Sequence, residues 1–342
     1  MANEIHISFN ASDRSYFSIL KKEIHQIAVG LHFSQKKIGE IDIIVAEITS
    51  NLAKHAGGGE ILVHAITAPD EEGLEIISLD NGPGMTDPLK MINDGMSTAN
   101  TLGHGLGAIK RLSDNFEIFS LKDWGTVLLS RVFKKSSTAQ SKSKSKTEIR
   151  SIVVAKPGET VSGDATFHKV TKEHVTLFIG DGLGHGIEAY KAVMHAVDTV
   201  AKTPFILSPS EMLRQIHTET KRTRGLVGTV AIYSIKQKTW NICGIGNIAT
   251  KSTNGFTSKN YLSYNGIIGH NIPNTLKEQV TDAEHSQTII MCSDGIKTRW
   301  DLQKYPGILK CDLSILATVI YKDHARKTDD MSVIVGRVNG KI

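Results

Sequence analysis

The chain has 342 residues, of which 40% are hydrophobic and 22% are charged, and its formal net charge is +5. This length and composition indicate a globular protein of about two domains. One short segment, Lys134–Thr147, accounts for the whole charge excess, because it contains five lysines and no acidic residue. Because the remaining residues sum to a net charge of zero, the overall charge gives little support to nucleic-acid binding.

The segment Lys134–Thr147 reads KKSSTAQSKSKSKT and has no aromatic or branched aliphatic residue. It therefore has no apolar surface with which to offset the entropy lost when a backbone becomes ordered. Alternating Ser and Lys is typical of a flexible, solvated linker. We expect a first domain over 1–133, a linker over 134–147 and a second domain over 148–342.

The cysteines Cys243, Cys292 and Cys311 have no metal-type spacing and form no close pair, which is typical of a protein from a reducing compartment. The N-terminal residues resemble neither a signal peptide nor a transit peptide. No apolar run approaches the ~18 residues that a membrane helix needs. The sequence thus predicts a cytoplasmic protein without membrane contact.

Hydrophobic periodicity predicts the elements of the first domain. Ser34 is a candidate N-cap for its second helix. The expected elements are a strand around Ile5–Phe9, helices over Tyr16–Val29 and Gln35–His55, and strands over Glu60–Ile66 and Leu74–Leu79.

Polar side chains recur along one face of that second helix. Glu47, Asn51 and His55 are each four residues apart, so an α-helix projects them from the same side. Taken alone, this row is read more readily as a solvent-exposed stripe than as a binding site.

Two glycine-rich turns follow in the same domain. Asp80–Met85, DNGPGM, comes directly after a predicted strand and combines a carboxylate with glycines that permit a tight turn. Gly103–Gly107, GHGLG, opens a predicted helix over Ala108–Ser113, where free backbone N–H groups suit a phosphate. A glycine loop alone is weak evidence, but three motifs in this order strengthen one another.

In this order the motifs resemble those of the Bergerat-fold ATPases, the GHKL superfamily. The resemblance implies ATP as ligand, with Glu47 as general base, Asn51 holding Mg²⁺ and Asp80 binding the adenine amino group. It extends to Thr126, which it places on the last strand of the domain and in the nucleotide site. The other implied nucleotide-binding residues are Gly82, Gly84, Gly103, Gly105 and Gly107.

Within the superfamily, the sequence is most similar to the bacterial anti-sigma-factor serine kinases, and among them to the stressosome switch kinases. Only 34 residues precede the second helix, which leaves no room for the dimerising helix of a sensor histidine kinase. The similarity implies in-line transfer of the γ-phosphoryl group from ATP to a Ser or Thr of a small STAS-domain protein.

Acidic motifs mark the second domain, and each lies beside a predicted apolar strand. Carboxylates gathered at one end of a sheet sandwich repel each other unless cations neutralise them, and hard oxygen ligands favour Mg²⁺ or Mn²⁺. Two such ions polarise a phosphate and generate hydroxide for in-line attack. The motifs are Ser162-Gly163-Asp164, Asp181-Gly182, Asp294-Gly295 and Asp329-Asp330.

The order GD, DGxGHG, SDG and DDMSVIV resembles the PPM-type metal-dependent Ser/Thr phosphatases in their compact, SpoIIE-like form. The resemblance implies two Mn²⁺ or Mg²⁺ ions, with Asp181 bridging them and Asp294 as the second catalytic carboxylate. Asp330 is the less certain member of its pair. The implied metal ligands are Asp164, Asp181, the carbonyl of Gly182, Asp294 and Asp329.

The sequence departs from the family pattern at one position. The eukaryotic phosphatases have an arginine just before the first acidic motif that holds the substrate phosphate, whereas Gly158–Val161 precede it here. Phosphate recognition must rest on the metals alone or on another residue. His185, in the DGLGHG motif, is a further candidate, although a histidine at a helix entry is more often structural.

The predicted fold class is α+β, a Bergerat-fold α/β sandwich followed by a PPM-type α-β-β-α sandwich. The predicted function is that of a fused Ser/Thr protein kinase and metal-dependent phosphatase acting on STAS-domain proteins, with a sigma factor or a downstream regulator as a further candidate partner. The alternative is that the first domain only binds ATP and a partner, with little turnover, and that only the phosphatase is catalytic.

Overall fold

The computed structural model describes residues 5–68, 71–92, 105–135, 147–203, 207–283 and 287–338. The chain divides into two compact units. The small unit comprises His6–Ser143 and Lys310–Thr318, and the large unit comprises Met1–Ile5, Lys144–Leu309 and Val319–Ile342. Residues 136–146 of the expected linker lie outside the described ranges, so the linker stays a prediction.

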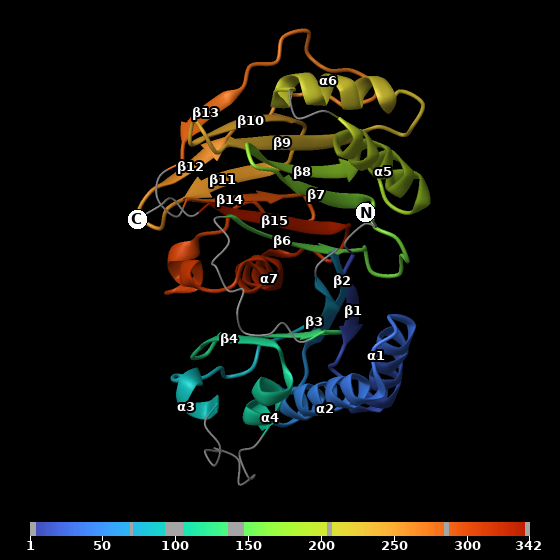
Figure 1. The fold of residues 1–342 in the computed structure, drawn as a ribbon, viewed down its shortest axis with the longest axis vertical. Coiled ribbons are helices and arrows are strands. Elements are labelled where there is room, and N and C mark those ends of the chain that lie inside the picture. The colour runs from blue at the N-terminus through green and yellow to red at the C-terminus, as the bar shows by residue number, and fades with distance from the viewer. Residues whose placement is uncertain are drawn as a thin grey trace. The chain divides into compact units, whose positions relative to one another are not determined.

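The small unit is built on one antiparallel sheet with the strand order β1-β2-β3-β5-β4, and helices cover one of its faces (Figure 1). Strands and helices lie where the periodicity predicts them. Its elements are β1 (Ile7–Asn10), α1 (Phe17–Gly30), α2 (Gln35–Asn51), β2 (Glu60–Ala68), β3 (Glu71–Asp80), α3 (Pro88–Ile92), α4 (Gly105–Leu112), β4 (Asn115–Leu121) and β5 (Gly125–Phe133).

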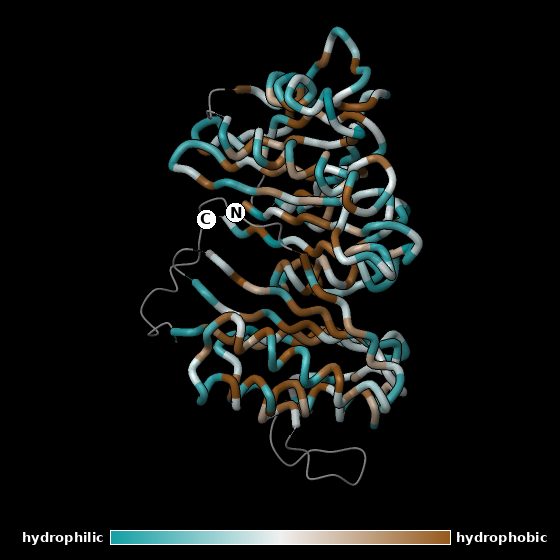
Figure 2. The backbone as a smooth tube through the Cα atoms, turned by 90° about the vertical axis from the view of Figure 1, so that its right-hand side faces the viewer, coloured by the Kyte–Doolittle hydropathy of each residue, from teal (hydrophilic) through white to brown (hydrophobic). Residues whose placement is uncertain are grey.

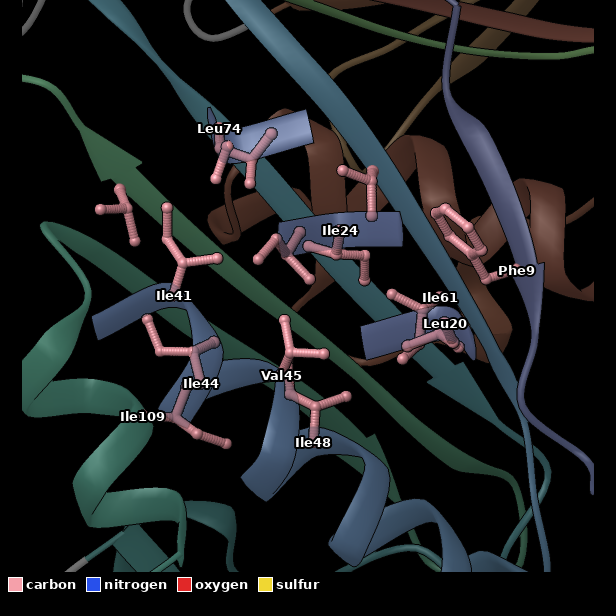
Figure 3. Close-up of a cluster of buried hydrophobic side chains, with 14 of the residues drawn as sticks. Phe9, Leu20, Ile24, Ile41, Ile44, Val45, Ile48, Ile61, Leu74 and Ile109 are labelled. Carbon is pink, nitrogen blue, oxygen red and sulfur yellow. The ribbon is translucent and has the colours of Figure 1, made fainter. Parts of the chain in front are cut away.

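Alternate residues of the strands pack against the helices and form the core of the small unit (Figure 3). Ile61 of β2 and Leu74 of β3 meet Ile24 of α1 and Ile44 of α2 in one buried cluster. This packing follows from the two periodicities, because a strand turns every second residue and a helix every third or fourth toward the same layer.

The helix α2 begins as predicted and ends earlier. The side chain of Ser34 caps its N-terminus by accepting a hydrogen bond from the Lys37 N–H. The α-helix ends at Asn51, and Leu52–Ala56 form a π-helical turn. The α-helix is therefore shorter than the predicted Gln35–His55, and His55 lies in the π-helical turn that continues it.

The other face of the small unit's sheet carries a buried ion pair. Glu75 of β3 lies directly opposite Arg131 of β5, and the Arg131 Nε–H donates to a Glu75 carboxylate oxygen over 2.6 Å. The segment Lys310–Thr318 completes this face of the unit: Arg131 donates to both carboxylate oxygens of Asp312, over 2.7 and 2.9 Å, and to the Ser314 hydroxyl over 2.8 Å. The network satisfies two charges that are almost fully buried.

The large unit contains two five-stranded antiparallel sheets, ordered β13-β10-β9-β8-β7 and β12-β11-β14-β15-β6 (Figure 1). Its helices are α5 (Ile187–Lys202), α6 (Pro209–Glu219) and the last part of α7 (Leu313–His324), which begins in the small unit. Its strands are β6 (Thr147–Val154), β7 (Asp164–Val170), β8 (His174–Gly182), β9 (Leu226–Ser234), β10 (Thr239–Ile245), β11 (Ala249–Thr253), β12 (Ser258–Tyr261), β13 (Gln279–Asp282), β14 (Gln287–Cys292) and β15 (Met331–Val338).

Two hydrophobic layers hold the large unit together. One lies between the sheets and includes Leu177 of β8 and Ile289 of β14. The other lies between the first sheet and its two helices and includes Phe178 of β8, Val193 of α5 and Leu213 of α6. Successive residues of β8 thus contribute to different layers, and both faces of this strand are buried. Figure 2 shows the hydropathy along the backbone, with hydrophobic stretches in the interior and hydrophilic ones in many of the loops.

The predicted α+β class is confirmed, with one single-sheet unit and one two-sheet sandwich that carries helices outside its sheets. Within the described residues, no helix combines the length and the apolar character needed to cross a membrane.

Candidate active sites

The first candidate site lies where the end of α2 meets the start of α4. Glu47 and Asn51 are one turn apart on α2, and Gly105 is the first residue of α4. A Cβ added to Gly105 would lie 2.8 Å from a Glu47 carboxylate oxygen and 3.4 Å from the Asn51 side-chain oxygen. The start of α4 thus lies close to the carboxylate of Glu47 and the amide of Asn51, where the free N–H groups of a helix N-terminus suit an anionic ligand.

The second part of this site lies where β3 ends and β5 begins. Asp80 ends β3 and pairs with Thr126 of β5 across the ladder. The Asp80 carboxylate accepts a hydrogen bond from the Gly82 N–H over 2.8 Å, which fixes the turn after the strand. A Cβ on Gly84 would lie 1.9 Å from the Leu121 carbonyl oxygen, so the DNGPGM turn packs too closely for any other residue there.

The remaining glycines of the predicted nucleotide site divide into two groups. Gly105 and Gly107 lie in the first turn of α4, so the predicted helix begins three residues earlier than expected, inside the glycine motif. Gly103, with its neighbour His104, lies outside the described residues.

The acidic motifs of the large unit gather at one end of its sandwich. Asp164 begins β7 and pairs with Asp181 near the end of β8. Asp294 follows β14, and Asp329 and Asp330 precede β15. Because neighbouring strands are antiparallel, the start of one strand lies beside the end of the next, which brings all these positions to one edge.

The electrostatics of Asp164 and Asp181 reflect this crowding. Burial raises the pKa of Asp164 to about 7, and Asp330 and Asp294 add to the shift. Burial, together with the charges of Asp164, Asp294, Asp329 and Asp330, raises the pKa of Asp181 to about 10. Without a cation, these carboxylates do not all ionise at neutral pH.

One carboxylate oxygen of Asp164 is buried and has no hydrogen-bond partner. An orphaned acceptor beside several acids suits a cation, since a cation supplies the missing partner and neutralises the repulsion. Among the described residues, no group of three or more Asp, Glu, His or Cys side chains has already closed around a common metal position. The carboxylates therefore fit divalent ions by their chemistry and are not clustered into a finished coordination sphere.

The two aspartates of the last motif have different surroundings. Both Asp330 oxygens accept backbone hydrogen bonds, one from the Lys156 N–H over 2.8 Å and the other from the Gly163 N–H over 2.9 Å. Among the described residues, the Asp329 carboxylate accepts one hydrogen bond, from the Asp330 N–H over 2.9 Å. Asp330 thus joins two loops, and Asp329 has more acceptor capacity left for a metal.

Two residues that the sequence did not single out hold Asp294 in place. The Asn247 side-chain amide donates to the Asp294 carboxylate over 2.8 Å, and the Arg326 Nε–H donates to the Asp294 carbonyl oxygen over the same distance. Asn247 lies in the short turn between β10 and β11. No local pattern connects either residue to a motif 47 or 32 positions away.

The remaining residues of the DGLGHG motif shape the turn into α5. A Cβ on Gly182 would lie 2.4 Å from the Ala189 carbonyl oxygen, so this glycine permits α5 to approach β8. His185 Nδ1 lies 2.7 Å from the carboxylate of Glu159, and both side chains are half-exposed. This pairing favours the structural interpretation of His185.

Comparison with known proteins identifies the family of the first site. Residues 11–131 match the model of the histidine kinase-like ATPase domain. The serine/threonine-protein kinase RsbT of Bacillus subtilis (strain 168) is 36% identical over 100 residues, which cover 29% of this chain and 75% of that protein. Through this domain, the chain belongs to the family of histidine kinase-like ATPase domains that includes RsbT.

A solved structure extends the likeness beyond residues 11–131. A chain from the bacterial stressosome, described as a modular system adapted to control secondary messenger signalling, has 27% identity and a TM-score of 0.51, over 56% of this chain and 99% of its own. That share is larger than residues 11–131 supply, so the likeness includes the large unit. RsbX in complex with magnesium has 19% identity and a TM-score of 0.49, over 56% of this chain and 96% of its own.

Proposed function

We propose that the chain carries two opposed activities: a protein Ser/Thr kinase in the small unit and a metal-dependent phosphatase for phosphoserine or phosphothreonine in the large unit. The observation that carries the proposal is the gathering of Asp164, Asp181, Asp294 and Asp329 at one edge of a two-sheet sandwich, with an unpartnered, buried Asp164 oxygen. A set of acids this crowded is costly unless it binds cations.

In the phosphatase site, two divalent ions would supply a hydroxide nucleophile and polarise the phosphate. The protein's part is to hold the ligands in place. Asp164 and Asp181 are fixed by the β7–β8 ladder, and Asn247 orients the Asp294 carboxylate. Asp330 ties the Gly163 turn to the start of β15, so its neighbour Asp329 is held at the same edge. These contacts preorganise the carboxylates for the ions.

In the kinase site, the residues of α2 and of the turn after β3 would act as the resemblance to the GHKL ATPases implies. Glu47 accepts the proton of the substrate hydroxyl, Asn51 would hold Mg²⁺, and Asp80 would bind the adenine amino group. The close approach of Gly105 to Glu47 and Asn51 supports this assignment, because it brings the start of α4 to these side chains. The N-terminal N–H groups of α4 face the phosphates in this arrangement.

The substrates of both sites, in this proposal, are STAS-domain proteins and their phosphorylated forms. The family relation to the kinase RsbT and the 27% identity with a chain of the bacterial stressosome support this class of partner. A kinase and a phosphatase in one chain would then set the phosphorylation state of one partner in opposite directions.

Asn51→Ala is expected to weaken Mg²⁺-dependent ATP binding by at least about tenfold, because it removes a metal-orienting side chain. Calorimetric titration of the full chain with ATP, with and without Mg²⁺, measures the effect. Lys36→Ala is the matched control, since Lys36 is 87% exposed at the start of the same helix. Unchanged ATP affinity in Asn51→Ala would refute the assignment of this site.

Phosphoryl transfer is tested with labelled ATP and purified STAS-domain proteins. The Asp294→Asn background is used, because it prevents the large unit from removing the label. Label should accumulate on the STAS-domain protein and should be lost when Glu47→Gln is added. If ATP binds in an Asn51-dependent way and no label is transferred, the small unit is a binding module, and the kinase half of the proposal is wrong.

A further inference from the structure

Arg224 lies beside the turn that follows β8, in the loop before β9. The loop is fixed to that turn by the Leu183 N–H, which donates to the Gly225 carbonyl oxygen over 3.1 Å. The Arg224 carbonyl oxygen lies 2.9 Å from His270 Nε2. The backbone of Arg224 is thus held on both sides, while its side chain is exposed.

The Arg224 guanidinium lies against Gly184. A Cβ added to Gly184 would be 3.1 Å from the Arg224 Nη1 atom and 3.4 Å from its Cζ atom. Gly184 has a φ of +80° and no side chain, so the flat guanidinium rests directly on the turn. The guanidinium therefore lies beside the DGLGHG turn.

The same turn adjoins the carboxylates. The Gly182 N–H donates to the Gly163 carbonyl oxygen over 2.9 Å, and a Cβ on Gly163 would lie 3.4 Å from the Gly184 carbonyl oxygen. The Gly163 N–H in turn donates to Asp330 over 2.9 Å. Arg224 thus lies at the rim of the acidic edge, next to the turns that carry Asp164 and Asp181.

Within the part of the chain that the structure describes, the Arg224 side chain makes no hydrogen bond and lies within 4 Å of no carboxylate. Another arginine, Arg326, is by contrast engaged: its Nε–H donates to the Asp294 carbonyl oxygen. Four ligand carboxylates balance two divalent cations, so a phosphate dianion would reach a site with no positive charge to spare. A guanidinium at the rim supplies that charge and two parallel N–H donors.

We propose that Arg224 binds the phosphate of the substrate beside the metal-ligating carboxylates. This inference rests on the proposed phosphatase function and fills the position that the missing arginine before Asp164 leaves open. Arg224 touches the substrate in this proposal and does not touch the metals. Its loss should therefore weaken phosphate binding and leave metal binding unchanged.

The test uses the full chain loaded with Mn²⁺ and inorganic phosphate as the probe. Calorimetry is expected to show about ten- to hundredfold weaker phosphate binding in Arg224→Ala, the effect of losing charge-assisted hydrogen bonds. The phosphate affinity of Arg224→Lys should lie between those of Arg224→Ala and the wild type, because lysine keeps the charge and loses the paired donors. Arg222→Ala, an exposed arginine two residues earlier, is the control and should bind like the wild type.

Two further measurements separate this proposal from the one on which it rests. Mn²⁺ titration should give the same affinity in Arg224→Ala as in the wild type, and phosphopeptide hydrolysis should show a raised KM. Wild-type phosphate affinity in Arg224→Ala would overturn the role of Arg224 alone. A wild-type chain that binds no Mn²⁺, or whose hydrolysis survives Asp294→Asn, would instead overturn the phosphatase assignment.

Discussion

The variants Asp181→Asn and Asp294→Asn are expected to hydrolyse a phosphopeptide at least about 100-fold more slowly than the wild-type chain in the presence of Mn²⁺. Changes in residues that merely orient metal ligands already cost about 10–100-fold, and these two are proposed as ligands themselves. Phosphate release from the full chain over a range of Mn²⁺ concentrations measures the effect. Full activity in both variants would refute the metal cluster.

The control for these variants is Asp198→Asn, because its side chain lies exposed on α5, paired with Lys202. Loss of folding is a separate question, which the thermal midpoint without metal answers. Burial and the neighbouring acids raise the pKa of Asp181, so the charged carboxylate is already disfavoured in the metal-free fold. Asp181→Asn should therefore not lower the midpoint, and any loss of activity then reports on the site.

Arg131→Met is expected to destabilise the small unit by about 3–5 kcal/mol, the cost of leaving a buried charge without its partner. The side chains of Arg131 and Glu75 are 2% and 4% exposed, so water does not replace the lost contact. Hydrogen exchange of the β3 and β5 peptides in the full chain measures the local effect. Lys134→Met is the control, because Lys134 directly follows β5 and its pair with Glu72 of β3 is partly exposed (27% and 59%), so the pair contributes about 0–1 kcal/mol. A loss below about 1 kcal/mol for Arg131→Met would show that the network is not stabilising.

The same network predicts a pH dependence. Burial alone would raise the pKa of Glu75, but Arg131 and His6 outweigh it and hold that pKa well below its usual value of 4.5. A depressed carboxyl pKa stabilises the fold above the unfolded value and loses that contribution as the pH falls through the folded one. Protection of β3 should stay constant above about pH 4.5 and fall below it. In Arg131→Met the fall should begin at a higher pH.

Much of the fold and of the candidate sites could be predicted from local sequence patterns. The strands β8, β14 and β15 are apolar runs that end or begin at an acidic motif, so both their extent and the place of Asp181, Asp294 and Asp329 follow from neighbouring residues. Glu47 and Asn51 share a helix face for the same reason. The boundary of α2 was predicted less well, because a π-helical turn replaces the α-helix after Asn51.

By itself, the sequence determined the α+β class and the ATPase family, because periodicity and short motifs are properties of adjacent residues. The tertiary structure alone decided which distant residues meet. It paired Arg131 with Asp312, 181 positions away, and grouped Lys310–Thr318 with the small unit. In the folded chain, both carboxylate oxygens of Asp330 also accept hydrogen bonds from backbone amides, and the Arg224 guanidinium lies against Gly184. These contacts depend on how whole sheets and loops pack, and no spacing along the chain encodes them.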